Sequence, residues 1–146
     1  MTVYRFVPLL ILGLAGLSQA QSPSPGQWQI SVESRAAEFP MALPPVQVSQ
    51  CLRAADAKDP SKLLGNISSP GAQNCTYSDR RFTGNSFHFA MSCAGSFALK
   101  ATGDVSFTPT SLSGTIVTAA QLDGQAINMD NVVTAQRTGD CAGAAP

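Results

Sequence analysis

Apolar and polar residues alternate most regularly between Ser86 and Phe107. Apolar side chains occupy every second position on both sides of a break at Ala94-Gly95. Successive side chains of a strand point to opposite faces of a sheet, so this alternation predicts two strands, each with one buried and one solvated face. The glycine at the break predicts a β-hairpin. Because this segment holds four of the seven phenylalanines, we expect it to form the centre of the core.

Shorter alternating segments predict the other strands. Trp28, Ile30 and Val32 alternate with polar residues near the start of the chain, and Gly84-Asn85 and Asp123-Gly124 are typical of two-residue hairpin turns. The expected strands cover residues 27–34, 46–52, 75–83, 86–93, 97–107, 111–120 and 125–138. Asp130-Asn131 interrupts the last of them and suggests a β-bulge.

One short helix is expected in residues 54–64, with Asp59 as its cap, Pro60 at the first helical position and Gly65 at its end. The whole pattern predicts an all-β fold, an antiparallel meander of about seven strands. Such a sheet hides its edges by curling or by folding into two layers, so a small barrel, a half-barrel and a sandwich are all open alternatives. Late strands rich in Thr, Ser and Gly favour the curved forms.

The first twenty residues are typical of a secretory signal peptide. Arg5 supplies a positive charge, residues 6–17 form an apolar run, and Ser18-Gln19-Ala20 has small residues at the two positions that signal peptidase reads. The run is shorter than the roughly twenty residues of a membrane-spanning helix. We therefore expect cleavage after Ala20, no transmembrane span afterwards, and a periplasmic or secreted protein. The expected mature chain consists of a flexible leader (21–26), a single disulfide-linked β domain (27–141) and a short tail (142–146).

The charge balance excludes two classes of partner. Only 12% of the residues are charged, and nine basic residues balance nine acidic ones. Nucleic acids and anionic membranes are bound through basic patches, so neither is expected as a partner. The pattern gives no information on the oligomeric state.

Four cysteines, Cys51, Cys75, Cys93 and Cys141, follow the expected signal peptide. An even number in an exported domain predicts two disulfides, and four cysteines allow three connectivities. We favour Cys51–Cys75, which would close a short excursion of the chain, and Cys93–Cys141, which would tie the chain end to the central hairpin. The chain has no Cys-X-X-Cys motif that would indicate a redox or zinc site.

No group of residues predicts catalysis or a cofactor. His88 is the chain's single histidine and lies on the polar face of an expected strand, where it reads as a surface residue. The nine carboxylates are scattered, and nothing in their spacing selects a pair. One histidine and four cysteines expected in disulfides leave few metal ligands. We therefore expect no enzyme, no cofactor and no metal site.

The proline-rich segment 39–45 offers a candidate binding surface. It carries apolar side chains between prolines, which form either a docking patch or a plug for one end of the barrel. Together with the apolar face of the 86–107 hairpin, it defines the possible contact residues for a ligand or partner: Phe39, Met41, Leu43, Phe87, Phe89, Met91, Phe97 and Leu99.

Several short motifs follow one another along the chain after the signal peptide. They are Pro25-Gly26-Gln27-Trp28, the proline-rich turn before Gln50-Cys51, the Asp- and Pro-containing helical segment, Asn74-Cys75, Met91-Ser92-Cys93 before Ala94-Gly95, and Gly139-Asp140-Cys141. Together with the signal peptide, this order resembles that of the domain of unknown function 3617 family of exported bacterial proteins. The resemblance covers nearly all of the mature chain. One departure is Ala119-Ala120-Gln121-Leu122, where many members have an aromatic or Met-rich segment. The resemblance implies a periplasmic β-rich domain and brings no activity with it.

Two functions are compatible with these features. The first is a non-catalytic domain that binds a small apolar ligand or a partner segment. The alternative is a structural or accessory envelope protein that acts through protein–protein contacts alone, for example by adding a strand at an exposed sheet edge.

Overall fold

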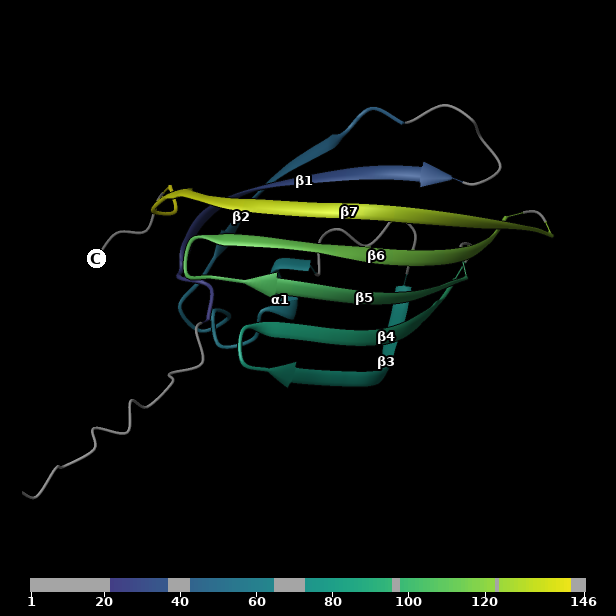
Figure 1. Ribbon diagram of the computed structural model, residues 1–146, viewed down its shortest axis with the longest axis horizontal. Helices are drawn as coiled ribbons and strands as arrows, with labels where there is room; N and C mark the ends of the chain where they lie inside the picture. The colour runs from purple at the N-terminus through teal and green to yellow at the C-terminus, as the bar shows by residue number, and fades with distance from the viewer. Residues whose placement is uncertain (1–21, 37–42, 65–72, 96–97, 123, 143–146) are drawn as a thin grey trace, which may run out of the picture.

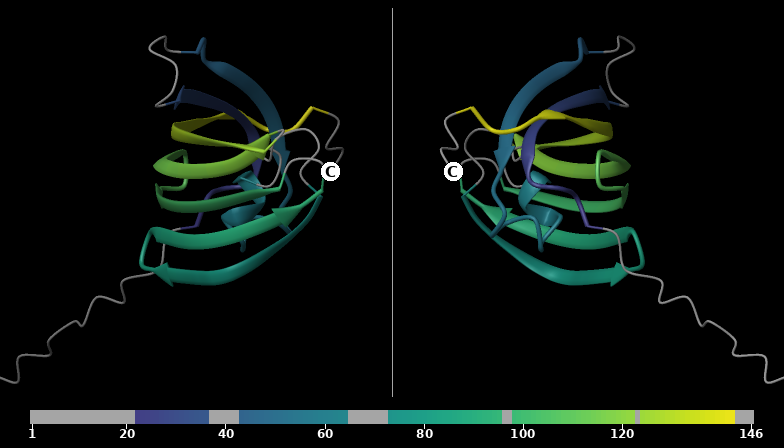
Figure 2. Two further views of the ribbon diagram at one scale, coloured as in Figure 1. Left: turned by 90° about the vertical axis from the view of Figure 1, so that its right-hand side faces the viewer. Right: turned by 90° about the vertical axis from the view of Figure 1, so that its left-hand side faces the viewer.

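The computed structural model describes residues 22–36, 43–64, 73–95, 98–122 and 124–142. These residues form one curved antiparallel sheet with a short helix on its concave side (Figures 1 and 2). The elements are β1 (Gly26–Ala36), β2 (Val46–Leu52), α1 (Ser61–Leu64), β3 (Gln73–Thr83), β4 (Ser86–Ala94), β5 (Leu99–Phe107), β6 (Ser111–Leu122) and β7 (Gln125–Gly139). The expected all-β fold is confirmed. The sheet does not close, so the half-barrel is the alternative that applies.

The strand order is β2-β1-β7-β6-β5-β4-β3. The expected meander holds for β3 to β7, whose neighbours in the chain are neighbours in the sheet. β1 instead pairs with β7, with Val32 opposite Val133, and β2 pairs with β1 on the other side. The two free edges of the described sheet are therefore β2 and β3.

The core lies on the concave face, where every second side chain of the central strands is buried. Burial alternates without interruption along β5, and Phe87 and Phe89 of β4 are 1% and 3% exposed. The rings of these two phenylalanines stack with centroids 5.3 Å apart. The expectation that the hairpin of β4 and β5 forms the centre of the core is confirmed.

A glycine on β5 allows the Phe89 ring to pack closely against the strand. Gly103 of β5 lies opposite Phe89, and a Cβ atom there would lie 2.5 Å from the Phe89 ring. A glycine in a strand weakens it by itself but permits such a close approach. The phenyl ring covers the space over the glycine, so the core stays filled at this point.

The predicted bulge at Asp130-Asn131 is wrong. The register of β7 with β6 and β1 continues through these residues without a shift, and Asn131 turns toward the concave face. Its carboxamide nitrogen donates hydrogen bonds to the Ile116 carbonyl (3.0 Å) and to Thr118 Oγ1 (3.1 Å), and its oxygen accepts one from Ser34 Oγ (2.6 Å). A polar residue is tolerated in the apolar pattern because its hydrogen-bonding groups have partners.

The expected helix at 54–64 is shorter than predicted. Residues 54–58 form turns, in which Ala57 N donates to the Arg53 carbonyl, and α1 itself has four residues. Asp59 is the cap, as predicted: its Oδ1 accepts a hydrogen bond from the Ser61 backbone N–H (3.1 Å). Gly65 lies outside the described residues. In the part of the chain that the structure describes, no helix is long and apolar enough to cross a membrane.

The predicted disulfide pairing is wrong. The structure joins Cys51 to Cys141 and Cys75 to Cys93. Cys75 and Cys93 face each other across the β3–β4 ladder, so their side chains meet directly. Cys51 and Gly139 both lie opposite Gln27, from the two sides of β1, and this brings Cys141 within reach of Cys51. The prediction did not place β7 beside β1, the neighbourhood that brings Cys141 to Cys51. It also did not use the expected neighbours 75–83 and 86–93, across which Cys75 faces Cys93.

We expect the two disulfides to contribute unequally to stability. Cys51–Cys141 spans 90 positions and Cys75–Cys93 spans 18, so the chain-entropy model gives about 4.6 and about 3.2 kcal/mol respectively. Urea unfolding of the double variants Cys51→Ser/Cys141→Ser and Cys75→Ser/Cys93→Ser should show the larger loss for the first. Peptide mapping without reduction should recover the two observed pairs, and recovery of Cys51 joined to Cys75 would contradict the structure.

Candidate functional site

The apolar residues proposed from the sequence divide into three groups. Phe87, Phe89 and Leu99 are buried in the core, and Met91 is partly buried against it. Leu43, just before β2, is half exposed. Phe39, Met41 and Phe97 lie outside the described residues. The apolar face of β4 and β5 is therefore occupied by core packing, and exposed apolar surface has to be sought elsewhere.

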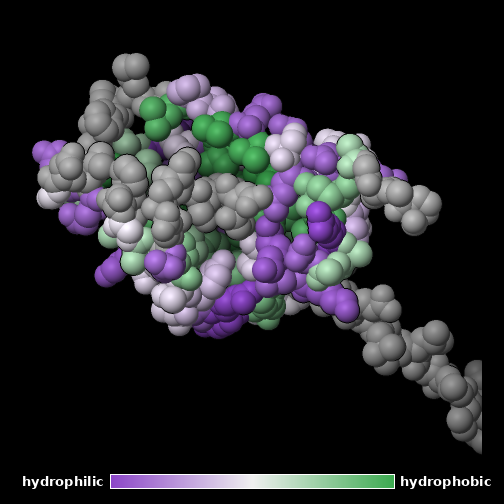
Figure 3. Space-filling model, turned by 180° about the vertical axis from the view of Figure 1, so that it is seen from behind, coloured by the Kyte–Doolittle hydropathy of each residue, from purple (hydrophilic) through white to green (hydrophobic). Residues whose placement is uncertain are grey.

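The two free edges carry exposed apolar side chains on their concave face. Val46 of β2 lies opposite the buried Val32 and is 59% exposed. On β3, Phe82 is 48% and Tyr77 39% exposed; Phe82 stacks on Phe87 with ring centroids 4.5 Å apart. Residues opposite each other in an antiparallel pair point to the same face, so all three belong to the inward side. We call Val46, Tyr77 and Phe82 the edge residues; Figure 3 shows the concave side, with apolar residues at the surface.

The segment 53–64 lies between these two edges and contacts both. On one side, the Gln50 side-chain nitrogen donates to the Lys62 carbonyl (2.9 Å). On the other, Arg80 of β3 forms an ion pair with Asp59 (2.9 Å) and donates to Ser61 Oγ (3.0 Å). Leu63 and Leu64 bury their side chains in the core beneath. This segment therefore fills part of the space between edges that share no backbone hydrogen bonds.

Arg80 is the residue of this face whose contacts sequence reasoning missed. Neighbours in a strand face opposite ways, and here Arg80 faces inward while Arg81 faces outward to Asp79 (2.8 Å). The Arg80 guanidinium lies 4.9 Å from the Tyr77 ring centroid, a cation–π distance. Its carboxylate partner Asp59 is 21 positions away, and no local motif connects the two.

The pKa of Asp59 is lowered by these contacts. Partial burial by itself would raise the pKa, but the hydrogen bonds from Ser61 and Arg80 and the charge of Arg80 outweigh it. A carboxylate with a lowered pKa in the folded state stabilises the protein above its unfolded pKa, and this contribution is lost as the pH falls through the folded pKa. The attachment of α1 to β3 is therefore weakened in acid, below about pH 4.

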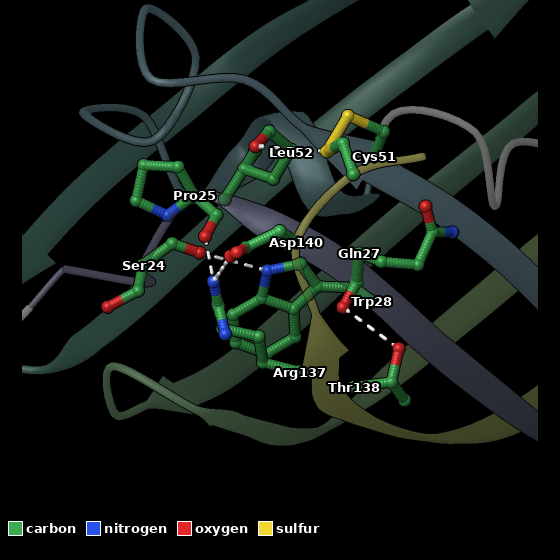
Figure 4. Close-up of polar contacts among 10 residues, drawn as sticks. Ser24, Pro25, Gln27, Trp28, Cys51, Leu52, Arg137, Thr138 and Asp140 are labelled. Carbon is green, nitrogen blue, oxygen red and sulfur yellow. Dashed lines mark hydrogen bonds and ion pairs between the residues drawn. A yellow bond between two sulfur atoms is a disulfide. The ribbon is translucent and has the colours of Figure 1, made fainter. Parts of the chain in front are cut away.

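Three of the motifs that carry the family resemblance, Pro25–Trp28, Gln50-Cys51 and Gly139–Cys141, meet at the start of β1 (Figure 4). The Trp28 indole N–H donates to the Ser24 carbonyl (3.0 Å), and Arg137 donates to the Pro25 carbonyl (2.8 Å) and pairs with Asp140 (2.6 Å). We call these five residues and the nearby Cys51–Cys141 disulfide the clasp. It ties the predicted leader to the end of β7 and holds the end of β2 beside both.

Two features of the backbone at the start of β1 allow the residues of the clasp to come into contact. Gly26 has a φ of 146°, which favours glycine, and a Cβ atom there would overlap the Gly139 carbonyl and the Arg137 side chain. The register of β1 with β7 shifts between Gln27 and Trp28, and Thr138 in the shifted segment donates from Oγ1 to the Gln27 carbonyl (3.2 Å). The polar groups named here bond within the chain, so we read the clasp as a structural unit.

A surface hollow of about 490 Å³ borders the clasp and the disulfide. Its residues are Pro25, Gly26, Cys51, Leu52, Arg53, Ala54, Asp140, Cys141 and Ala142. Arg53 and Asp140 are exposed and have opposite charges, and Asp140 already pairs with Arg137.

His88 lies on the convex face in a shallow polar groove of about 370 Å³. Its Nδ1 is 2.7 Å from Asp104 Oδ1, and its Nε2 is 3.8 Å from Asp79 Oδ2. The sequence could not select these two carboxylates, because they lie on the flanking strands β5 and β3. Since both ring nitrogens face carboxylates, neither is directed at a serine hydroxyl as a general base would be. Within the described residues, no three His, Cys, Asp or Glu side chains gather in a possible metal site.

We expect Asp59→Asn to loosen α1. The variant loses the charge that pairs with Arg80, and the pair is partly exposed, so the loss of stability at pH 7 should be about 1 kcal/mol or less. Hydrogen exchange of residues 61–64 should become faster at pH 7, and the difference from the wild type should shrink as the pH falls below about 4. Asp79→Asn, which removes an ion pair on the convex face, is the control and should leave exchange in α1 unchanged. Equal exchange in wild type and Asp59→Asn at pH 7 would show that the pair does not hold the helix.

One comparison with known proteins found a match. The model of a family described as "Protein of unknown function (DUF3617)" matches residues 23–141, which include the whole clasp and all four cysteines. No curated protein and no solved structure matches the chain. The match extends over all seven strands and confirms the resemblance that the motifs indicated. The chain therefore belongs to the DUF3617 family of proteins of unknown function.

Proposed function

We propose that this protein is a non-catalytic binding domain that takes an apolar ligand, or an apolar segment of a partner, on the open concave side of its sheet. The observation that carries the proposal is the exposure of the edge residues Val46, Tyr77 and Phe82 on the same inward face as the core. A closed barrel would bury such residues, whereas here they border the space between the two edges.

The chemistry of this face favours an apolar occupant. Arg80 and Arg137 are the charged inward side chains among the described strand residues, and each is paired with a carboxylate. Removing apolar surface from water contributes roughly 25 cal/mol per Å². Exposed apolar surface bordered by polar residues is typical of sites that bind ligands or partners. An apolar occupant therefore gains from the edge residues, and a charged one finds no free counter-charge among the inward side chains of the described strands.

The two disulfides support a location for this binding domain. Disulfides form and persist in oxidising compartments, so the two pairs indicate an environment outside the cytoplasm. Together with the signal-peptide pattern of residues 1–20, this supports a periplasmic or secreted binding domain.

Charge placed at the edge should weaken binding. We expect the neutral apolar dye N-phenyl-1-naphthylamine to bind the purified protein, and Val46→Asp to weaken it at least tenfold, about 1.4 kcal/mol. The matched control is Val117→Asp: Val117 is a valine of similar exposure (50%) on the convex face of β6, and this change should leave binding within twofold. Fluorescence titration gives the affinities, and circular dichroism verifies that both variants fold. No binding by the wild type, or equal loss in the two variants, would contradict the proposal.

A further inference from the structure

The two free edges of the sheet differ in how open they are to another strand. β3 carries Asp79, Arg80 and Arg81, and its register with β4 shifts at two places. Charges and bulges are the devices by which proteins prevent an edge from pairing with another chain. β2 has neither: it contains no charged residue and no proline, and its register with β1 runs unbroken from Leu52 to Val46.

β2 is also held in place as a rigid strand. The Cys51–Cys141 disulfide fixes one end, Gln50 bonds to the carbonyl of Lys62, and Ser49 Oγ donates to the Gln29 side chain on β1 (2.7 Å). An edge that is already ordered loses little conformational entropy when a strand is added, so it binds that strand more tightly.

From these observations we propose that β2 is a docking edge that accepts an extended segment of a partner protein as an eighth strand. The inference deepens the proposed function and rests on it, because the apolar side chains of the segment would cover Val46 and Val48 on the concave face. Backbone hydrogen bonds supply affinity in this mode of recognition, and the alternate side chains supply specificity.

The chemistry of β2 defines the segment. It is about seven residues long, the length of β2, and uncharged, because β2 offers no counter-charge. Its apolar residues occupy every second position, to meet Val46 and Val48, and its polar residues meet the outward Gln47 and Ser49. Residues 27–32 of β1, which pair with β2 on its other side, have this pattern with Trp28, Ile30 and Val32 facing inward.

A synthetic peptide with the sequence of residues 27–32 is therefore the probe. In a nuclear magnetic resonance titration of the purified protein, we expect backbone amide signals of β2 to shift and their hydrogen exchange to slow, with β3 unaffected. A peptide of the same composition that places Trp and Ile side by side should bind at least tenfold more weakly. A peptide methylated at its backbone nitrogens should also lose at least tenfold, because it cannot donate hydrogen bonds to the edge.

Variants of the protein test the edge itself. Val48→Lys puts an inward charge on β2 and should weaken peptide binding at least tenfold. Val117→Lys, which puts the same charge on the convex face of β6, should leave the affinity unchanged. No binding, equal affinity for the two peptide orders, or shifts centred on β3 would overturn the proposal. A protein that is dimeric by light scattering, with β2 amides already protected, would also overturn it and assign the edge to a second copy of the chain. If the dye still binds in a Val46-dependent way while the peptide fails, the strand addition is wrong and the proposed function survives.

Discussion

The rest of this structure depends on one constraint: the outer sides of the two edge strands of the described sheet have backbone hydrogen-bonding groups with no neighbouring strand to pair with. Seven strands curve without closing, so β2 and β3 keep unpaired sides in the described fold. The segment 53–64 lies between them, bonded to Gln50 on one edge and to Arg80 on the other, and its leucines complete the core. This segment contacts both edges through side chains and not through strand pairing. It leaves Val46, Tyr77 and Phe82 exposed, and from these residues we infer binding.

The clasp has a complementary role, because β1 is the strand whose position the chain order does not provide. β1 is about a hundred residues from β7, its neighbour in the sheet, and bringing such distant segments together costs loop-closure entropy. Arg137, the indole of Trp28 and the Cys51–Cys141 disulfide offset that cost at one corner. The clasp therefore brings together three motifs that are distant from one another in the chain.

Much of the fold could be predicted from alternation, because side-chain period and turn chemistry are local. The buried positions of β5 and the turn before β4 are examples. The sequence could not predict β1 beside β7, since turn signals specify only strands adjacent in the chain, and the Cys51–Cys141 pair depends on that neighbourhood. Cys75 and Cys93 lie on strands that are adjacent in the chain, so the local signals were enough to pair them. It also placed the binding surface on Phe87 and Phe89, which the core buries, because alternation identifies the apolar face of a strand but not what covers it. The contacts of Arg80 were missed because its ion-pair partner, Asp59, is distant in the chain.

The central claim is that the open side of the sheet holds an apolar occupant in the cell. Native mass spectrometry of the protein purified from the organism that makes it, beside Val46→Asp from the same source, tests this most directly. We expect the wild type to carry an additional mass, a small apolar molecule or a polypeptide, which leaves on unfolding and is absent from the variant. If the wild type is instead a bare polypeptide with two disulfides and, like the variant, carries no additional mass, the open side of the sheet holds no occupant.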